Sequence, residues 1–346
     1  MSSPRTPKSS VRVAVVGATG AVGTTMLEIL LERKFPASEI VALASERSAG
    51  QRVSVGERSF KVESLERHDF KGIDIALFSA GGSVSAVHAP RAAAAGAVVV
   101  DNTSQFRYED DIPLVVSEVN PDAIAGYRTR GIIANPNCST MQMLVALAPI
   151  HRAVGIERIN VATYQSVSGA GRSGVEELGR QTAQLLNFQD IKPSKFATQI
   201  AYNLIPQIDV FMDNGYTKEE MKMVWETQKI LGDPGILVNP TAVRVPVFYG
   251  HSEAVHIETR SKISAAEARA LLEQAPGVVV VDERVPGGYP TPVTHAAGKD
   301  PVYVGRIRED ISHPRGLSLW VVADNIRKGA ALNAVQIAEL LVKDHL

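Results

Sequence analysis

The chain contains a single cysteine, Cys138, whose neighbours could make it a nucleophile. It follows Asn135-Pro-Asn137, residue types typical of a helix boundary, and a helical run begins there. In the first turn of a helix a thiol faces unpaired backbone amides and the positive end of the dipole. Both lower its pKa below the ordinary ~8.5 and favour the thiolate. The alternative is a small buried hydrophobic residue, the usual role of a free cysteine.

Attack on an acyl carbon also requires a proton carrier and a donor for the developing oxyanion. His251 is one of eight histidines and follows Gly250 after the apolar run 241–249, where a side chain at a strand end can reach a cleft. The alternative for His251 is an exposed position in a turn. The backbone amide of Cys138, at the predicted helix start, is a candidate oxyanion donor.

A glycine-rich turn, Gly17-Ala-Thr-Gly20-Ala-Val-Gly23, separates an apolar strand from a helix. Glycines here let the backbone approach a pyrophosphate, which then lies on the amides of the helix N-terminus. The spacing differs from the usual G-x-G-x-x-G, so a turn that serves only packing is the alternative. The context of strand and helix favours nucleotide binding.

The second predicted strand leads into Glu46-Arg47-Ser48. Arg47 and Ser48 suit the 2′-phosphate of NADP, whereas an acidic residue such as Glu46 suits the free ribose hydroxyl of NAD. The sequence favours NADP here and keeps NAD open, with a solvated loop as the alternative.

Two arginines could bind anions. Arg107 follows Asp101-Asn-Thr-Ser at the C-terminal end of a predicted strand, where open α/β sheets place ligands. A surface arginine that caps a loop is the alternative. Arg244 lies within the otherwise apolar run 243–247, so its charge needs a partner or an anionic ligand.

A capping box at Thr217-Lys-Glu-Glu220 predicts the start of a helix. At ~100° per residue, Glu219, Lys222 and Glu226 share one face of it. The opposite face, predicted to pack, is formed by Met221, Val224 and Trp225. Taken alone, the pattern favours a solvated, ion-paired face for the charged residues.

The elements that must position these residues alternate in the first part of the chain. Apolar strands are predicted at 11–16, 40–44, 73–78, 97–100 and 132–134, with helical spacing at 24–33 and 85–95. Strands that are apolar on both faces and alternate with helices indicate a parallel sheet covered on both sides. The predicted fold class is therefore α/β, with a Rossmann-like, doubly wound nucleotide-binding domain.

After residue 138 the pattern changes. Helices are predicted at 138–153, 175–186, 219–231 and 330–341, and strands at 157–167, 241–249, 253–259, 278–281, 302–308 and 318–323. Adjacent strands without an intervening helix, such as 241–249 with 253–259, indicate an antiparallel or mixed sheet. This part is predicted to be an α+β catalytic and dimerisation domain with a mixed sheet.

Composition limits the function classes. The 346 residues favour two domains. With 36 basic and 37 acidic residues the net charge is −1, which disfavours nucleic acid or an anionic membrane as partner. One cysteine excludes an internal disulfide framework and a cysteine-based zinc site, and no metal is expected. No apolar run approaches the ~20 residues of a membrane span, so a cytoplasmic protein is expected.

Eight segments together resemble the aspartate-semialdehyde dehydrogenase family and occur in the family's order. They are Gly17 to Gly23, Asp101-Asn-Thr-Ser, Asn135-Pro-Asn-Cys-Ser-Thr, Gln165-Ser-Val-Ser-Gly-Ala-Gly171, Asn203-Leu-Ile-Pro-Gln, Glu219-Glu-Met-Lys222, Arg244 to His251 and Ala323-Asp-Asn325. The resemblance implies an NADP-dependent enzyme that reductively dephosphorylates L-aspartyl 4-phosphate to L-aspartate 4-semialdehyde. That reaction leads to lysine, threonine, methionine and diaminopimelate.

The resemblance also assigns roles in the site. Cys138 would attack the acyl phosphate and form a thioester, Gln165 would orient that acyl group and bind substrate, and His251 would be the acid/base. Arg244 would bind the substrate carboxylate and Glu219 its amino group. The phosphate would be held by Arg107 and Lys222. The NADP contacts would be Gly17, Thr19, Gly20, Ala21, Val22, Arg47, Ser48, Ser168, Gly169 and Asn325.

The resemblance and the patterns together give a domain scheme. Residues 1–10 are expected to be a disordered lead, 11–137 the NADP-binding domain completed by a C-terminal helix at 326–346, and 138–325 the catalytic and dimerisation domain. A homodimer or a dimer of dimers is implied. The alternatives are an N-acetyl-glutamyl-phosphate reductase, or a non-catalytic paralogue.

Overall fold

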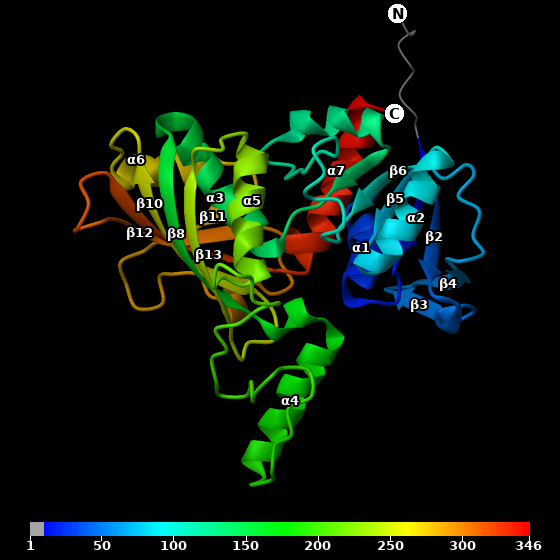
Figure 1. The fold of residues 1–346 in the computed structure, drawn as a ribbon, viewed down its shortest axis with the longest axis horizontal. Coiled ribbons are helices and arrows are strands. Elements are labelled where there is room, and N and C mark those ends of the chain that lie inside the picture. The colour runs from blue at the N-terminus through cyan, green and yellow to red at the C-terminus, as the bar shows by residue number, and fades with distance from the viewer. Residues whose placement is uncertain (1–9) are drawn as a thin grey trace, which may run out of the picture. The chain divides into compact units, whose positions relative to one another are not determined.

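The computed structural model describes residues 10–346, which form two compact units. The first unit comprises residues 10–136 together with Ala330–Leu346, and the second comprises Asn137–Gly329 (Figure 1). Apart from Ser10, the predicted N-terminal lead lies outside the described residues.

A seven-stranded sheet forms the centre of the first unit, in the order β3-β4-β2-β1-β5-β6-β7. Its strands are β1 (Val11–Val16), β2 (Ala37–Ala44), β3 (Arg52–Val55), β4 (Arg58–Ser64), β5 (Ile75–Phe78), β6 (Val98–Asp101) and β7 (Ile132–Ala134). Its helices are α1 (Ala21–Glu32), α2 (Gly82–Ala94) and α7 (Leu332–Asp344), with the short helices η1 (Glu46–Ser48) and η2 (Pro121–Thr129). All strand pairs are parallel except β3 with β4.

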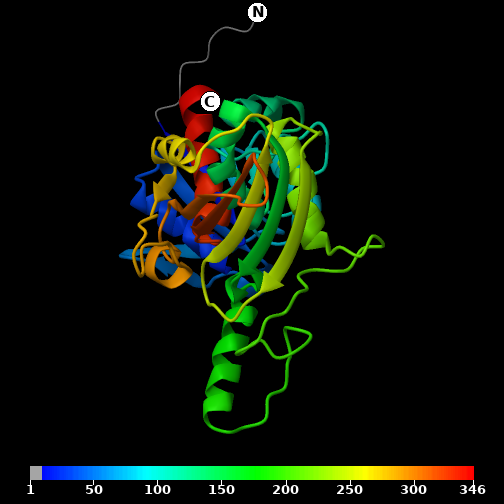
Figure 2. The same cartoon turned by 90° about the vertical axis from the view of Figure 1, so that its left-hand side faces the viewer.

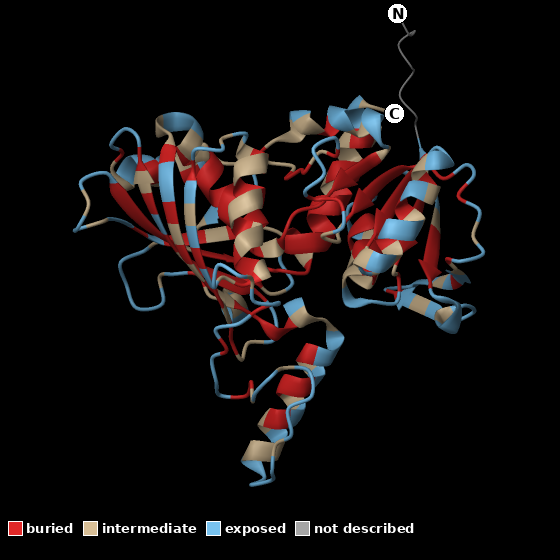
Figure 3. Ribbon diagram, in the orientation of Figure 1, coloured by how far each residue is buried: buried red, intermediate tan, exposed pale blue. Residues whose placement is uncertain are grey.

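Helices cover both faces of this sheet. Val13 and Val15 of β1 belong to one core cluster with apolar side chains of α1 and α7, whereas α2 packs against β5, β6 and β7. Strands β1, β5, β6 and β7 are almost entirely buried, as Figure 3 shows in red for the centre of the sheet. The predicted doubly wound α/β fold is confirmed, because strands that are apolar on both faces need two covering layers.

Several bounds in this unit differ from the predictions: the helix predicted at 85–95 begins at Gly82 and the strand predicted at 40–44 begins at Ala37. The helix predicted at 24–33 begins three residues earlier, at Ala21, directly after the glycine-rich turn. The antiparallel hairpin of β3 and β4 was not predicted, because these strands carry mostly exposed polar residues and lack a buried apolar run. The hairpin forms one edge of the sheet.

The second unit is built on a mixed six-stranded sheet in the order β11-β12-β13-β10-β8-β9. Its strands are β8 (Ile156–Gln165), β9 (Leu237–Arg244), β10 (His251–Thr259), β11 (Val278–Val280), β12 (Val302–Glu309) and β13 (Gly316–Ala323). Its helices are α3 (Cys138–Val154), α4 (Arg172–Leu186), α5 (Lys218–Leu231) and α6 (Ala265–Glu273), with the short helices η3 (Val167–Ala170), η4 (Pro292–Ala296) and, at the boundary with the first unit, η5 (Arg327–Ala331). The mixed sheet is as predicted, because β8 pairs with β9 in parallel and with β10 antiparallel.

One face of this sheet is covered by helices. On the opposite face, within residues 10–346, the segment around η4 packs against β12 and β13, and Trp320 Nε1 donates a hydrogen bond to the backbone carbonyl of Pro290. The part of this face on β8 and β10 is called the uncovered face below. α3 packs against β8, β10, β12 and β13, and α5 packs on β9. Along β8 the residues alternate accordingly: Ile159, Val161 and Thr163 are buried, while Ala162 and Tyr164 on the opposite face are half-buried. Figure 2 shows β8, β9 and β10 side by side in this sheet.

The predicted strand at 241–249 and its pairing with 253–259 were wrong. β9 ends at Arg244, and β10 pairs with β8 and β13 instead. The segment after Arg244 leaves the ladder to support η3, since Val247 and Phe248 accept backbone hydrogen bonds from Val167 and Ser168. Apolar composition alone could not distinguish a strand from a buried loop.

α4 extends away from the sheet of the second unit (Figure 2). Val167 and Leu178 form a small core with Ile200, Ala201 and Ile205. The buried Glu177 side chain accepts hydrogen bonds from the backbone of Ser194 and Lys195, which fixes the returning loop against the helix. α4 and the loop that returns along it are therefore held together by their own contacts.

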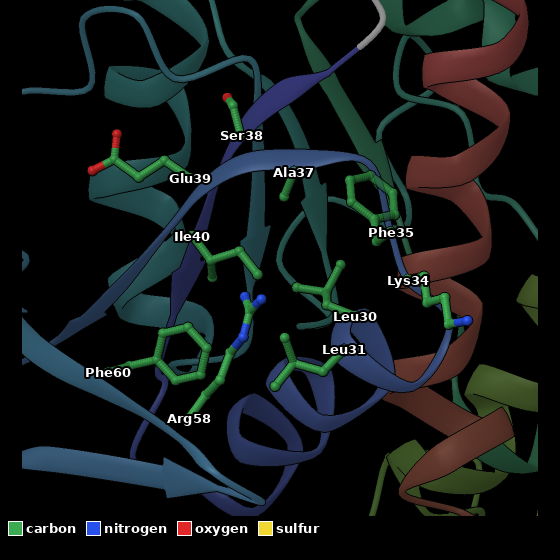
Figure 4. A pocket seen from close by; sticks show the side chains of 10 residues that line it. All are labelled: Leu30, Leu31, Lys34, Phe35, Ala37, Ser38, Glu39, Ile40, Arg58 and Phe60. Carbon is green, nitrogen blue, oxygen red and sulfur yellow. The ribbon is translucent and has the colours of Figure 1, made fainter.

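A pocket of about 440 Å³ opens in the first unit. Figure 4 shows Leu30, Phe35 and Phe60 as apolar walls, with the guanidinium of Arg58 pointing between Leu30 and Ile40. The pocket lies where β2 begins, whereas the glycine-rich turn follows the end of the parallel strand β1. The pocket therefore lies at the N-terminal ends of the parallel strands, whereas the predicted nucleotide site lies at their C-terminal ends.

Candidate functional site

Cys138 is the first residue of α3, as predicted. The preceding Asn137 caps the helix, because its Oδ1 accepts hydrogen bonds from the backbone amides of Ser139 (3.0 Å) and Thr140 (3.2 Å). Gly329 lies against the nucleophile: a Cβ added there would be 2.7 Å from Cys138 Cβ, so only glycine fits without a shift. The half-buried thiol thus lies at the positive end of a buried helix.

Glu219 connects three elements around Cys138. Its Oε1 accepts hydrogen bonds from Asn137 Nδ2 (2.8 Å) and Gln165 Nε2 (3.1 Å), and its Oε2 lies 2.9 Å from Lys222 Nζ. Lys222 makes a second ion pair at 2.8 Å with Asp209. A carboxylate of α5 therefore fixes the end of β8 and the start of α3.

The electrostatics keep this pair charged. Burial opposes ionisation of Glu219, but the Lys222 ammonium and the hydrogen bonds from Asn137 and Gln165 prevail and lower its pKa to about 2. Burial likewise opposes the charge on Lys222, but Glu219 and Asp209 raise its pKa overall. Both groups are therefore ionised at neutral pH.

The predicted orientation of α5 was wrong, although its capping box at Thr217 is confirmed. The buried face contains Glu219, Met223, Glu226 and Ile230, and the predicted packing residues are only half-buried; these are Met221, Val224 and Trp225. The reason is that the carboxylates have buried partners: Glu226 accepts a 2.6 Å hydrogen bond from the backbone amide of Asn137. The expectation of a solvated charged face is overturned.

Arg244 is the last residue of β9 and lies beside Gln165 in the parallel ladder. Its side chain is 6% exposed, and Nη1 donates a 2.7 Å hydrogen bond to the backbone carbonyl of Ser166. Burial lowers the pKa of Arg244, and the negative charges of Glu219 and Cys138 oppose that effect. The guanidinium would therefore stabilise a thiolate at Cys138.

His251 is the first residue of β10 and is fully buried. Its Nδ1 lies 3.1 Å from the backbone nitrogen of Ser166 and 3.0 Å from its Oγ. Burial, and next the nearby charge of Arg244, lower its pKa to about 3. The imidazole is therefore neutral in the free protein at physiological pH.

Ser168, Gly169 and Asn325 surround this histidine. Asn325 Oδ1 accepts hydrogen bonds from Ser168 Oγ (3.1 Å) and from the backbone amide of Gly250 (3.0 Å). A Cβ added at Gly169 would lie 2.8 Å from Arg244 Nη1 and 3.3 Å from His251 Nε2. Glycine at 169 therefore leaves the space that both side chains need.

The predicted residues fall into two sets, one in each unit. The second unit brings together Cys138, Gln165, Ser168, Gly169, Glu219, Lys222, Arg244, His251 and Asn325. Arg107 and the glycine-rich turn belong to the first unit. Arg107 is buried on its own loop, where it donates hydrogen bonds to the backbone carbonyls of Asn102 (2.9 Å) and Thr103 (3.1 Å).

The glycine-rich turn fits a dinucleotide phosphate. Gly17 has a φ of +86°, and a Cβ there would be 2.5 Å from the carbonyl oxygen of Ser79; at Gly23 it would be 2.1 Å from that of Gly17. α1 has neither a side-chain cap at Gly20 nor an acidic residue in its first turn, so its amides face outward with no anion of their own. Thr19, Ala21 and Val22 complete the turn.

Arg47 and Ser48 lie in η1, next to Glu46. The Glu46 carboxylate forms an ion pair with Arg67 at 2.5 Å. With its charge partly compensated there, Glu46 is less suited to a ribose hydroxyl, and Arg47 and Ser48 remain suited to a 2′-phosphate. The local charge pattern favours NADP over NAD.

Sequence reasoning missed several residues that build the site. Asn137 was seen only as a helix boundary, although it is both the cap of α3 and a donor to Glu219. Ser166 and Gly329 lie inside recognised segments or just after them, but their roles depend on contacts far along the chain. Asp209 gave no sequence signal, because its partner Lys222 is on another element.

Within residues 10–346 no group of three or more His, Cys, Asp or Glu side chains is arranged to hold a metal ion. In the same part of the chain, no helix has the length and apolarity needed to cross a membrane.

Two protein-family models match the chain. The one described as "Semialdehyde dehydrogenase, NAD binding domain" covers residues 12–127, and the one described as "Semialdehyde dehydrogenase, dimerisation domain" covers residues 147–328. Together they match most of the chain. The first match includes the glycine-rich turn, and the second begins within α3 and extends to residue 328.

Known relatives are similar over nearly the full length. Aspartate-semialdehyde dehydrogenase 2 of Vibrio cholerae is 64% identical over 333 residues, covering 96% of this chain and 98% of that protein. The aspartate-semialdehyde dehydrogenase of Bacillus subtilis is 50% identical over 342 residues, covering 96% and 98%.

Solved structures show the same similarity. The crystal structure of aspartate semialdehyde dehydrogenase II from Vibrio cholerae, complexed with ASA, matches with a TM-score of 0.96 and 62% identity, covering 98% of this chain and 100% of that one. The enzyme from Candida albicans with NADP matches with a TM-score of 0.74 and 26% identity, covering 96% and 98%. The chain belongs to the aspartate-semialdehyde dehydrogenase family.

Proposed function

We propose that the chain catalyses the NADPH-dependent reductive dephosphorylation of L-aspartyl 4-phosphate to L-aspartate 4-semialdehyde. The observation that carries this proposal is the arrangement of Cys138 at the start of α3, within reach of the charge of Arg244 and beside the Glu219–Lys222 pair. A nucleophile, a buried cation and an ionised acid–base pair match an acyl phosphate that also has a carboxylate and an amino group. The relatives with this activity are similar over nearly the whole chain.

Cys138 performs the covalent chemistry. Its thiolate attacks the carbonyl carbon of the acyl phosphate, the C–O bond to phosphate breaks, and inorganic phosphate leaves with the bonding electrons. A thioester on Sγ results, and the backbone amide of Cys138 is positioned at the helix start to stabilise the intervening oxyanion. NADPH, when bound, supplies the hydride that reduces this thioester; Cys138 then leaves as the thiolate and the aldehyde is released.

The neighbouring side chains orient the substrate and handle protons. Arg244 binds the α-carboxylate through its planar fork, and Glu219 accepts from the substrate amino group. Gln165, held by Glu219 and by Thr163, orients the acyl group and contacts the substrate. His251 is the acid/base. Lys222 and Arg107 hold the phosphate, which is the anionic product of the first step.

The cofactor residues belong to both units. The turn of Gly17, Thr19, Gly20, Ala21 and Val22 would hold the pyrophosphate at the start of α1, with Arg47 and Ser48 at the 2′-phosphate. Ser168, Gly169 and Asn325 would position the nicotinamide end. We assign residues 11–137, with 326–346, to NADP binding, and 138–325 to catalysis and dimerisation.

The assembly we propose is a homodimer formed by the uncovered face of the second-unit sheet. Tyr164 and Trp320 stack there with ring centroids 5.5 Å apart, and Ala162 and Ala254 lie half-buried beside them. A half-buried apolar sheet face is suited to pairing with a second copy. A dimer of dimers would be a further assembly. A reactive thiol suits the reducing cytoplasm, where we place the protein.

The reverse reaction tests the proposed function. Purified protein is mixed with aspartate semialdehyde, phosphate and NADP, and NADPH absorbance is followed; NAD then replaces NADP. We expect NADPH formation that requires phosphate and is much slower with NAD. Activity on N-acetyl-glutamate semialdehyde but not on aspartate semialdehyde would contradict the proposal, as would no activity on either.

A further inference from the structure

Ser166 contacts two residues of the proposed site, Arg244 and His251. It is fully buried between the end of β8 and η3. Its backbone carbonyl accepts from Arg244 Nη1 at 2.7 Å, and its backbone nitrogen lies 3.1 Å from His251 Nδ1. One peptide segment therefore holds both the guanidinium and the imidazole.

The contact with His251 determines where the imidazole proton lies. A backbone amide can only donate, so His251 Nδ1 must accept, and the neutral ring then carries its proton on Nε2. The Ser166 hydroxyl is 3.0 Å from the same Nδ1 and 3.0 Å from Asn325 Oδ1. Asn325 Oδ1 is itself oriented by the amide of Gly250 at 3.0 Å. Within residues 10–346, Nε2 is buried and makes no hydrogen bond, and it lies next to the space over Gly169.

We propose that Ser166 is a positioning residue that holds His251 as the Nε2–H tautomer, so that the histidine enters the reaction as a hydrogen-bond donor. This inference rests on the proposed function, in which His251 is the acid/base. Its Nε2–H would donate to the carbonyl oxygen of the bound acyl group as negative charge develops there. The start of α3 and the charge of Arg244 stabilise the Cys138 thiolate that attacks, and His251 serves as the acid.

Two substitutions of Ser166 separate its backbone amide from its hydroxyl. Ser166→Ala keeps the amide N–H. Ser166→Pro removes it at a φ of −64°, a value that proline adopts, and Gln165 before it is already extended. Ser264→Pro, at a φ of −79° before α6, is a matched control outside the site.

The tautomer is read directly by nitrogen NMR of protein labelled with ¹⁵N-histidine, with the His251 signals assigned by their loss in His251→Gln. We expect a protonated Nε2 and an unprotonated Nδ1 in the parent protein and in Ser166→Ala, and loss of that pattern in Ser166→Pro. A protonated Nδ1 with a bare Nε2 in the parent protein would overturn the proposal. This readout does not use activity, so it stands apart from a failure of the proposed function.

Kinetics provide the second readout, on variants whose thermal unfolding shows that they are folded. We expect kcat of Ser166→Pro to fall on the order of 100-fold below that of Ser166→Ala, with KM changed by less than about threefold. Ser264→Pro should keep the parent kcat. Equal kcat values for the two Ser166 variants would contradict the proposal, and if Ser166→Pro does not fold, the parent and Ser166→Ala spectra decide.

Discussion

At the scale of single residues, the site depends on charges that are buried together. Arg244, Glu219 and Lys222 are all largely buried, and each has a partner: a carbonyl for the arginine, and each other for the acid and the amine. Buried charges of this kind are costly unless they are hydrogen-bonded. The proposed substrate carries both signs of charge, and binding it would account for these buried charges.

Arg244→Lys tests the carboxylate site. Lysine keeps the charge but loses the planar fork, so we expect KM for aspartate semialdehyde to rise about 10- to 100-fold while kcat changes much less. Steady-state kinetics of the reverse reaction measure both constants. An unchanged KM would remove Arg244 from substrate binding.

Glu253→Gln tests a buried acid outside the proposed chemistry. Glu253 is fully buried in β10, and burial raises its pKa well above the ordinary 4.5. The folded state therefore keeps a proton that the unfolded state releases above that value, so the free energy of unfolding falls as the pH rises. Glutamine does not ionise and should remove this loss.

We compare the unfolding temperature of Glu253→Gln with that of the parent. The difference, variant minus parent, should increase by about 2 to 4 °C or more from about pH 5 to about pH 8. Thermal unfolding at both pH values measures this. Glu57→Gln, in the exposed turn after β3, is the matched control and should follow the parent. Parallel pH dependences for Glu253→Gln and the parent would show that Glu253 does not contribute this effect.

At the scale of elements, helix starts position the chemistry. α3 begins at Cys138, α5 begins directly after its cap Thr217 with Glu219 in the first turn, and α1 begins directly after Gly20 of the glycine-rich turn. The caps Asn137 and Thr217 are local signals for the starts of α3 and α5, whereas α1 has no side-chain cap and its start was predicted three residues too late. The buried face of α5 could not be predicted, because Glu219 and Glu226 are buried only through partners on other elements.

Thr217→Ala tests whether the cap of α5 serves both stability and binding. Thr217 and Ser264 each complete a capping box, so either alanine substitution should destabilise by about 1 kcal/mol. Thermal unfolding measures this loss. Only Thr217→Ala should also raise KM, because α5 carries Glu219 and Lys222 in its first two turns. A parent-like KM for Thr217→Ala would separate helix capping from substrate binding.

At the scale of the whole molecule, the sheets of the two units differ in how well the sequence predicted them. The parallel strands β1 and β5 of the first sheet were predictable because they are apolar on both faces, whereas the polar hairpin of β3 and β4 was missed. The mixed character of the second sheet was predicted, but the strand at 241–249 was placed too far along the chain, because β9 is Leu237–Arg244. Its predicted partner 253–259 pairs instead with β8 and with the distant β13. The proposed site residues were chosen from the sequence by type and motif, whereas the contacts between them came only from the fold.

The proposed dimer can be tested on the uncovered sheet face. Ala162→Arg places a charge among half-buried apolar residues, and its desolvation without a partner should prevent pairing. Light scattering should give a mass near 37.1 kDa for this variant and twice that for the parent. Val87→Arg, on the exposed side of α2, is the control and should keep the parent mass. A dimeric Ala162→Arg variant would place the interface elsewhere.

The central claim is the thioester on Cys138, and trapping it is the most direct test. Protein is mixed with aspartate semialdehyde and NADP without phosphate, quenched, and analysed for NADPH formed and for the mass of the Cys138 peptide. The account predicts one NADPH per Cys138, an acyl group on that peptide, continued turnover once phosphate is added, and none of these in Cys138→Ala. Repeated turnover without phosphate, or a burst with no acyl group on Cys138, would contradict it.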